Sequence, residues 1–250
     1  MSQKFLKNES LLISSKILNS SLKRQPTKHI IIDNAFSQPF IDRAYKNFKV
    51  NNINWEINND ENIEIKLRSK WNSEFDIPDG MIDIVRILNS SIFLNSVSEI
   101  FKINQIIPDP YFTGGGLNLI KRNGILAVHV DGNYHKKMNL NRRLNAILFF
   151  NKNWKDNWNG DFCFYNRNGE KLEKKISPNY NRLFIFETHD YSFHGHPTPL
   201  MCPNNRSRKS LILYYYTSNK TDSINIDIKK PHRALWKNLN KKDKDGNQSL

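Results

Sequence analysis

Short apolar runs separated by turn residues occupy the second half of the chain, after Pro108. Each run is wholly apolar or alternates with polar residues, and Asn, Gly or Pro stands between one run and the next, which is typical of strands joined by turns. The runs are LNLI, ILAVHV, LNAILFFN, DFCFYN, RLFIFET and SLILYYYT, between residues 117 and 217. Consecutive strands of this kind predict an antiparallel sandwich or barrel.

Strand and helix patterns alternate in the segment before these runs. KHIIIDNAF (28–36) predicts a short buried strand. SQPFIDRAYKNF (37–48) has Ser37 as a candidate N-cap, Pro39 in the first turn and apolar residues at helical spacing, which predicts an amphipathic helix. Apolar residues from Met81 to Ile103 recur every three to five positions, which predicts one broken helix or two short ones. We expect these helices to support the strands.

The two ends of the chain are polar. Residues 1–27 contain no long periodic segment and predict a loosely held lead-in. Residues 221–250 form a basic tail whose final dozen residues are expected to be disordered, while Trp236 is expected to pack back on the domain. A strand with supporting helices at 28–106 and a β core at 107–220 complete a single domain.

Composition narrows the classes of function. No stretch approaches the roughly 18 consecutive apolar residues of a membrane helix, and the first residues are too polar for a signal peptide, so we expect a soluble cytoplasmic protein without a membrane partner. Cys163 and Cys202 supply neither a disulfide framework nor a four-cysteine zinc site, so a metal would need histidine and carboxylate. The net charge is +14, but Lys, Asn and Ile are abundant throughout, and a nucleic-acid partner is not favoured. Nothing indicates an oligomeric state.

Candidate metal ligands lie at the end of the run ILAVHV. Side chains two apart in a strand share a face, so His129 and Asp131 point to the same side. The apolar residues Leu126, Val128 and Val130 point to the other side. H-x-D also arises often by chance, so the motif alone is weak evidence for a metal site. A metal site of this kind would need a second histidine from a distant strand. Two histidines and one carboxylate on one face of an octahedron are the ligands of a non-heme Fe(II) site.

The stretch ETHDYSFHGHPTP (187–199) supplies three histidines for this role, namely His189, His194 and His196. We prefer His194, because Gly195 lets the backbone pass close to a ligand and because a further strand follows. A single loop histidine is more often satisfied by water, and His189 and His196 remain alternatives.

The run RKSLILYYYT provides a candidate anchor for an anion. By alternation Arg208, Ser210, Ile212 and Tyr214 share one face, and the guanidinium is a planar fork that matches a carboxylate. Arg206 shares this face and is a rival anchor. An H-x-D, a distant histidine and an R-x-S strand, in this order, are much rarer by chance than any one of them.

Together these elements resemble the prolyl-4-hydroxylase-like branch of the Fe(II)- and 2-oxoglutarate-dependent dioxygenases. The matching text is GILAVHVD, RRLNAILFFNKNW with NGDFCFYN, ISPNYNRLFIFET, SFHGHP and RKSLILYYYT. The resemblance implies a mainly β fold, a double-stranded β-helix or jelly roll, supported by N-terminal helices. It implies Fe(II) as cofactor, with 2-oxoglutarate and molecular oxygen as cosubstrates.

Position by position, the resemblance also implies roles. His129, Asp131 and His194 correspond to the iron ligands, and Arg208, with Ser210 beside it, to the anchor of the far carboxylate of 2-oxoglutarate. Relatives that halogenate replace the carboxylate ligand with a small residue, so Asp131 argues for hydroxylation.

The sequence departs from this family at two places, and one is Arg206, the rival anchor on the Arg208 face. Many of these hydroxylases hold the far carboxylate with a tyrosine on the strand after H-x-D, where this chain has Phe149 and Phe150. Tyr134 and His135, just past the metal pair, are candidates for the substrate mouth, although solvated loop residues are an equal alternative.

The sequence therefore predicts a dioxygenase that hydroxylates an unactivated C–H bond while 2-oxoglutarate becomes succinate and carbon dioxide. The resemblance favours a peptidyl side chain such as proline, with a free amino acid or a sugar as the small-molecule alternative. The non-enzymatic alternative is a basic jelly-roll module that binds nucleic acid or a ribosome. Nucleic-acid repair relatives carry two arginines five residues apart, but Arg206 and Arg208 are only two apart.

Overall fold

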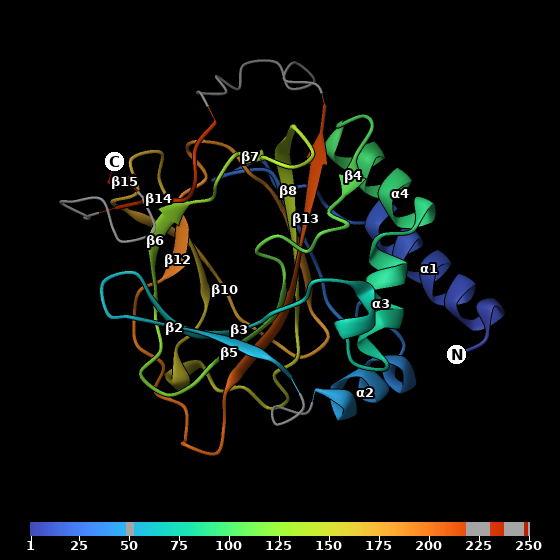
Figure 1. Cartoon of the computed structure of the whole chain (residues 1–250), viewed down its shortest axis with the longest axis horizontal. Coiled ribbons are helices and arrows are strands. Elements are labelled where there is room, and N and C mark those ends of the chain that lie inside the picture. Colours follow the sequence, from blue (N-terminus) through green and yellow to red (C-terminus); the bar gives the residue numbers. More distant parts are fainter. Residues whose placement is uncertain (49–52, 219–230, 238–247, 250) are drawn as a thin grey trace.

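The computed structural model describes residues 1–48, 53–218, 231–237 and 248–249, which form one curled sheet and a group of helices (Figure 1). The helices are α1 (Gln3–Leu18), α2 (Gln38–Asn47), α3 (Met81–Leu88) and α4 (Ser91–Phe101), with 3-10 turns η2 (Glu74–Asp76) and η3 (Asp156–Trp158). The strands are β1 (His29–Ile32), β2 (Trp55–Asp60), β3 (Glu64–Ser69), β4 (Ile107–Pro108), β5 (Gly116–Ile120), β6 (Leu126–Val130), β7 (Tyr134–His135), β8 (Leu140–Phe149), β9 (Phe162–Tyr165), β10 (Leu172–Ile176), β11 (Leu183–Glu187), β12 (His194–His196), β13 (Arg208–Thr217), β14 (Leu235–Trp236) and β15 (Gln248–Ser249).

The main path through the sheet runs in the order β1-β11-β8-β13-β5-β3-β6-β12-β9-β10. Neighbours along this path are antiparallel. All six strands predicted from the apolar runs are present, as β5, β6, β8, β9, β11 and β13, and so is the buried strand β1. The predicted fold class, a mainly β jelly roll supported by N-terminal helices, is confirmed.

The helices lie together beside β8 and β13, whereas β6, β12 and β14 lie on the opposite side of the molecule (Figure 1). Alternation along β13 explains this arrangement. Leu211, Leu213 and Tyr215 are buried in the large core that contains the helix side chains. The residues between them face the inside of the curled sheet, so one strand serves both the core and an interior cavity.

Helix α1 corrects the prediction of a loosely held lead-in. It begins at the N-cap Ser2, and its Ile13 and Ile17 are fully buried against the other helices. Polar residues of α1 also face inward. The Glu9 carboxylate, for example, accepts the backbone N–H of Ser37 at 3.1 Å. Since partners distant in sequence satisfy these polar groups, the helix lacks the clean apolar stripe by which sequence reasoning recognises one.

The remaining helix predictions are confirmed. Ser37 is the N-cap of α2, although its side chain makes no capping hydrogen bond. The Met81–Ile103 segment forms two short helices, and the hydroxyl of Ser90, the N-cap of α4, accepts the backbone N–H of Phe93 at 3.3 Å. None of the helices in the described ranges is long and apolar enough to cross a membrane.

The hairpin β2–β3 was not expected in the segment before residue 107. β3 pairs with both β5 and β6 and so joins the two parts of the sheet. The sequence of β3, EIKLRS, is too polar to predict a strand, because its pairing depends on partners about fifty residues away. The predicted tail falls largely outside the described residues, but Trp236 does pack back on the domain and is 5% exposed.

Candidate metal centre and its cavity

Strands β6 and β12 bring the predicted metal ligands together. His129 and His194 are direct partners in the antiparallel pairing, and Asp131 directly follows the last residue of β6. The Nε2 atom of His129 lies 3.6 Å from one carboxylate oxygen of Asp131, and that of His194 lies 3.5 Å from the other. The three ligand atoms all lie within 4.8 Å of one another. We call these three residues the triad.

The pairing of β6 with β12 is irregular at this place. His194 lies opposite His129, but His196 lies opposite Leu126, so β6 has one extra residue. Leu126 therefore lines the same cavity as His129, which corrects the prediction that it points to the other side. A Cβ at Gly195 would lie 2.7 Å from a backbone oxygen of β6, so this glycine allows a close approach between strands rather than to a ligand.

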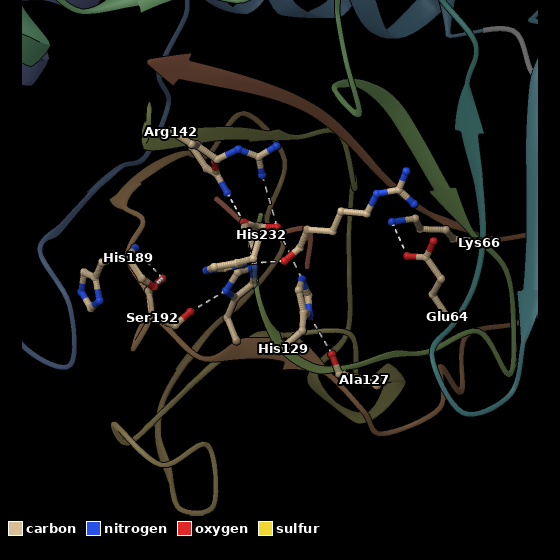
Figure 2. A network of polar contacts seen from close by, with 12 residues as sticks. Glu64, Lys66, Ala127, His129, Arg142, His189, Ser192 and His232 are labelled. Carbon is tan, nitrogen blue, oxygen red and sulfur yellow. Dashed lines mark hydrogen bonds and ion pairs between the residues drawn. The ribbon is translucent and has the colours of Figure 1, made fainter. Parts of the chain in front are cut away.

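Backbone hydrogen bonds orient both imidazoles. The Nδ1 of His129 lies 2.9 Å from the carbonyl oxygen of Ala127 (Figure 2). The Nδ1 of His194 lies 2.8 Å from the carbonyl oxygen of Ser192. Because a carbonyl can only accept, each Nδ1 carries the hydrogen and each Nε2 presents its lone pair to the triad. This arrangement is typical of metal-binding histidines.

Two residues of β8 hold the Asp131 carboxylate. Asn145 donates its side-chain N–H to Oδ2 at 2.6 Å, and the Arg142 guanidinium lies 3.5 Å from Oδ1. Arg142 in turn lies over the ring of Tyr214, 3.8 Å from its centroid. Burial alone would raise the pKa of Asp131, but the neighbouring imidazoles of His194 and His129 and the Arg142 guanidinium hold the pKa well below its usual range. The group is therefore a carboxylate at neutral pH.

The histidines of the triad are buried and enclosed by aromatic rings. Burial, together with the neighbouring His129, lowers the pKa of His194 to about 4, so this ring is neutral at physiological pH. Phe162 stacks on His194 with ring centroids 5.1 Å apart. Trp236, from the C-terminal segment, covers His129 at 4.5 Å and pairs with it through the backbone of β14. These rings restrict access of water to the triad.

The triad suits a divalent transition metal. It offers two imidazole nitrogens and one carboxylate, and among the described residues it is the group whose side chains could together hold a metal ion. Such a set leaves positions open for small-molecule ligands, as in non-heme Fe(II) oxygenases.

A cavity of about 930 Å³ opens beside the triad. Its walls are the inner face of the curled sheet, the hairpin β2–β3 and residues 231–236. Charged side chains of the hairpin wall pair with one another: Lys66 lies 2.6 Å from Glu64 (Figure 2), and Arg68 lies 2.6 Å from Glu56.

The predicted anchor residues line this cavity from β13. Arg208 is 5% exposed and donates its Nε–H to the carbonyl of Gly160 at 2.7 Å. Burial lowers its pKa to about 10, so the group remains cationic at neutral pH, and no carboxylate within the described ranges lies within 4.0 Å of it. The Ser210 hydroxyl is buried and has no hydrogen-bond partner among the residues that the structure describes. Arg206 is exposed, precedes β13 and does not line the cavity.

Sequence reasoning missed three residues that position the site. Gly160 has φ +84°, and a Cβ there would lie 3.1 Å from Cδ of Arg208, so glycine allows the carbonyl to reach the guanidinium. Arg142 and Asn145 flank Asp131 from β8. Period-two alternation along RRLNAILFF could have placed Asn145 on the inner face, but not against Asp131.

The other predicted residues differ in their surroundings. Tyr134 and His135 both line the cavity, as expected for a mouth. The Tyr134 side chain is partly buried, with its hydroxyl donating to Asn139 at 3.2 Å. His135 is buried, with Nε2 2.9 Å from the Thr113 hydroxyl. His189 does not line the cavity and lies apart from His129 (Figure 2).

Comparisons with known proteins agree with this geometry. Residues 115–216 match the model of the 2OG-Fe(II) oxygenase superfamily. The fold is similar to a prolyl hydroxylase from Trichoplax adhaerens, solved in complex with a hypoxia inducible factor oxygen degradation domain peptide fragment (TM-score 0.55, 14% identity, 86% of this chain and 94% of that chain). It is also similar to a prolyl-4-hydroxylase from Pseudomonas putida (TM-score 0.54, 12% identity, 83% and 98%). Sequence comparison finds no relative among curated proteins.

Proposed function

We propose that this chain, whose residues 115–216 match the model of the 2OG-Fe(II) oxygenase superfamily and whose fold is similar to that of prolyl hydroxylases, hydroxylates an unactivated C–H bond of a peptidyl side chain, with proline as the first candidate. Fe(II), 2-oxoglutarate and O2 are the cofactor and cosubstrates of this superfamily. The observation that carries the proposal is the buried triad, with both Nε2 atoms directed at Asp131, at the wall of a large cavity.

The triad would hold Fe(II) through His129 Nε2, His194 Nε2 and a carboxylate oxygen of Asp131. Bound there, the metal would supply the oxidation in which one oxygen atom of O2 enters the C–H bond and the other enters succinate as 2-oxoglutarate loses carbon dioxide. The protein fixes the ligands beforehand: Asn145 and Arg142 hold the carboxylate, and backbone carbonyls hold both imidazoles. Little reorganisation is then needed when metal binds.

Arg208 and Ser210 would hold the far carboxylate of 2-oxoglutarate. The guanidinium is cationic and buried, no protein carboxylate within the described ranges pairs with it, and its Nε is already fixed by Gly160. An anionic ligand would restore the pairing that a buried charge requires. The buried Ser210 hydroxyl, which has no partner in the described ranges, would gain one from the same ligand.

The cavity supports a substrate larger than the cosubstrate. About 930 Å³ is near the upper end of the roughly 300 to 1,000 Å³ of pockets that hold drug-sized ligands, and a five-carbon diacid fills only part of it. Tyr134 and the segment 231–236 border the space beyond the triad. The structural neighbour from Trichoplax adhaerens was solved with a peptide fragment, which favours a peptide in the corresponding place here.

Peptide oxidation provides the test. The full chain is incubated with Fe(II), 2-oxoglutarate and pooled proline-containing peptides, and succinate is measured together with peptide mass and fragmentation spectra. We expect 2-oxoglutarate-dependent addition of one oxygen atom to a prolyl residue, absent with His129→Ala and with matched peptides in which alanine replaces proline. Turnover restricted to free amino acids or sugars would overturn the peptidyl assignment, and a protein that binds neither metal nor 2-oxoglutarate would overturn the enzymatic one.

A further inference from the structure

His196 lines the cavity, and both of its ring nitrogens are buried without a hydrogen-bond partner among the described residues. The residue lies at the end of β12, two positions after His194, and is 3% exposed. Burying an imidazole without a partner costs free energy, and buried polar groups in proteins are normally paired. The missing partner is therefore expected to be a ligand of the cavity.

His196 and Arg208 lie at the same end of the cavity. His196 pairs with Leu126 at the start of β6, and Arg208 pairs with Ile120 at the end of β5. Leu126 and Ile120 are joined by a short turn, and both line the cavity.

The same end of the cavity lacks the tyrosine hydroxyl with which many of the similar hydroxylases hold the far carboxylate. Phe149 occupies β8 beside β13, with the Arg208 guanidinium 5.1 Å from its ring centroid, and it has no hydroxyl. Phe150 faces the helices in the large core. A carboxylate bound by Arg208 and Ser210 would thus have no hydroxyl donor from these two positions of β8.

We propose that His196 donates a ring N–H to the far carboxylate of 2-oxoglutarate and so completes, with Arg208 and Ser210, a three-sided carboxylate site. The inference rests on the proposed function. A neutral imidazole has one N–H and one lone pair, so it can supply this donor without a change of charge. His196 is then a cosubstrate-binding residue specific to this chain, not an alternative iron ligand, and its ring takes the place of the absent tyrosine hydroxyl.

The test separates the far carboxylate from the metal-binding end of the ligand. Protein loaded with Mn(II) without oxygen is titrated by calorimetry with 2-oxoglutarate and with 2-oxobutanoate, which has the same keto acid end but no far carboxylate. For His196→Ala we expect affinity for 2-oxoglutarate to fall roughly 10- to 100-fold, because the lost hydrogen bond is to a charged group, while affinity for 2-oxobutanoate stays within about twofold. His196→Asn, which keeps an N–H donor, should recover part of the loss.

Controls distinguish the ways in which the inference can fail. His189→Ala, outside the cavity, should leave both affinities unchanged, and Mn(II) stoichiometry and thermal unfolding are measured for every variant. An equal loss for both acids would show that His196 acts through the metal or the fold, and no loss for either would show a purely structural histidine. If His196→Ala does not fold, His196→Asn and His196→Gln carry the comparison. Failure of the unmodified chain to bind 2-oxoglutarate would instead overturn the proposed function.

Discussion

His129 and His194 face each other across strands β6 and β12 with their ring centroids 4.4 Å apart. In each case Nδ1 hydrogen-bonds the backbone carbonyl of the residue two positions earlier. Both rings are thus held by the backbone just before them in the chain, and their Nε2 atoms are directed at Asp131 before any metal arrives. Local backbone hydrogen bonds and one strand pairing organise the site, so the role of each residue can be tested by a single substitution.

Removal of a triad histidine should abolish tight metal binding. We expect His129→Ala and His194→Ala to lose Fe(II) or Mn(II) in calorimetric titration, because two ligands do not form a facial site. His189→Ala and His196→Ala should keep full metal stoichiometry. Loss of metal from His196→Ala with retention in His194→Ala would move the third ligand by two residues.

Asn145→Ala should weaken metal binding without abolishing it. Its N–H bond to Asp131 orients the ligand, and loss of such an outer partner typically costs about 10- to 100-fold in metal affinity. The matched control is Asn141→Ala on the same strand, since Asn141 is buried but does not line the cavity. Equal effects of the two substitutions would indicate general damage to β8 rather than a role at Asp131.

Arg208→Ala should raise the 2-oxoglutarate requirement far more than it lowers metal affinity. Leaving the cosubstrate carboxylate unpaired costs on the order of 2 to 5 kcal/mol, or roughly 30-fold to several thousand-fold in affinity. Ser210→Ala removes a neutral donor and should act in the same direction, by about 0.5 to 1.5 kcal/mol. Arg206→Ala is the control, because this side chain is exposed outside the cavity. The apparent 2-oxoglutarate constant decides, and a large effect confined to Arg206 would reverse the assignment.

Trp236→Ala should speed metal dissociation. The indole covers His129, and aromatic pairs contribute about 0.5 to 1.5 kcal/mol beyond burial, or roughly 2- to 12-fold in affinity. Trp236→Phe keeps an aromatic ring and should restore most of the affinity. Release of Mn(II) to a chelator measures the rate. Identical rates in all three proteins would show that the C-terminal segment does not shield the triad.

The metal-free protein should lose stability as the pH falls from 7 to 5. The pKa of His194 is about 4 in the folded protein, against an ordinary value of 6.5. Between these two values the unfolded chain binds a proton that the folded protein does not, so the free energy of unfolding decreases as the pH is lowered. Over this interval His194 alone accounts for about 2 kcal/mol. Burial lowers the pKa of His29 and His189 as well, which adds in the same direction.

Asp131 does not oppose this trend, because its ordinary pKa of 3.8 and its lowered folded value both lie below the interval. Urea unfolding of chelator-treated protein at pH 7 and pH 5 measures the change. An unfolding free energy that is equal or greater at pH 5 would contradict neutral burial of these histidines.

The sequence by itself determined six strands of the β core and two of the three triad residues, His129 and Asp131. Apolar runs of strand length between turn residues fixed β5, β6, β8, β9, β11 and β13, because burial on one or both faces leaves a local mark on composition. The H-x-D spacing placed His129 and Asp131 together for the same reason, since two residues apart in a strand is a local relationship. Alternation likewise put Arg208 and Ser210 on one inner face.

Only the tertiary structure chose among the three candidate histidines. His189, His194 and His196 look alike in sequence, and the pairing of β12 with β6 brings His194 to His129 while the irregular register carries His196 to the other end of the cavity. Helix α1, strand β3 and the partners Asn145 and Arg142 were hidden for a related reason. Their polar side chains are satisfied by groups far away in the chain, and such long-range pairing leaves no periodic signal in the local sequence.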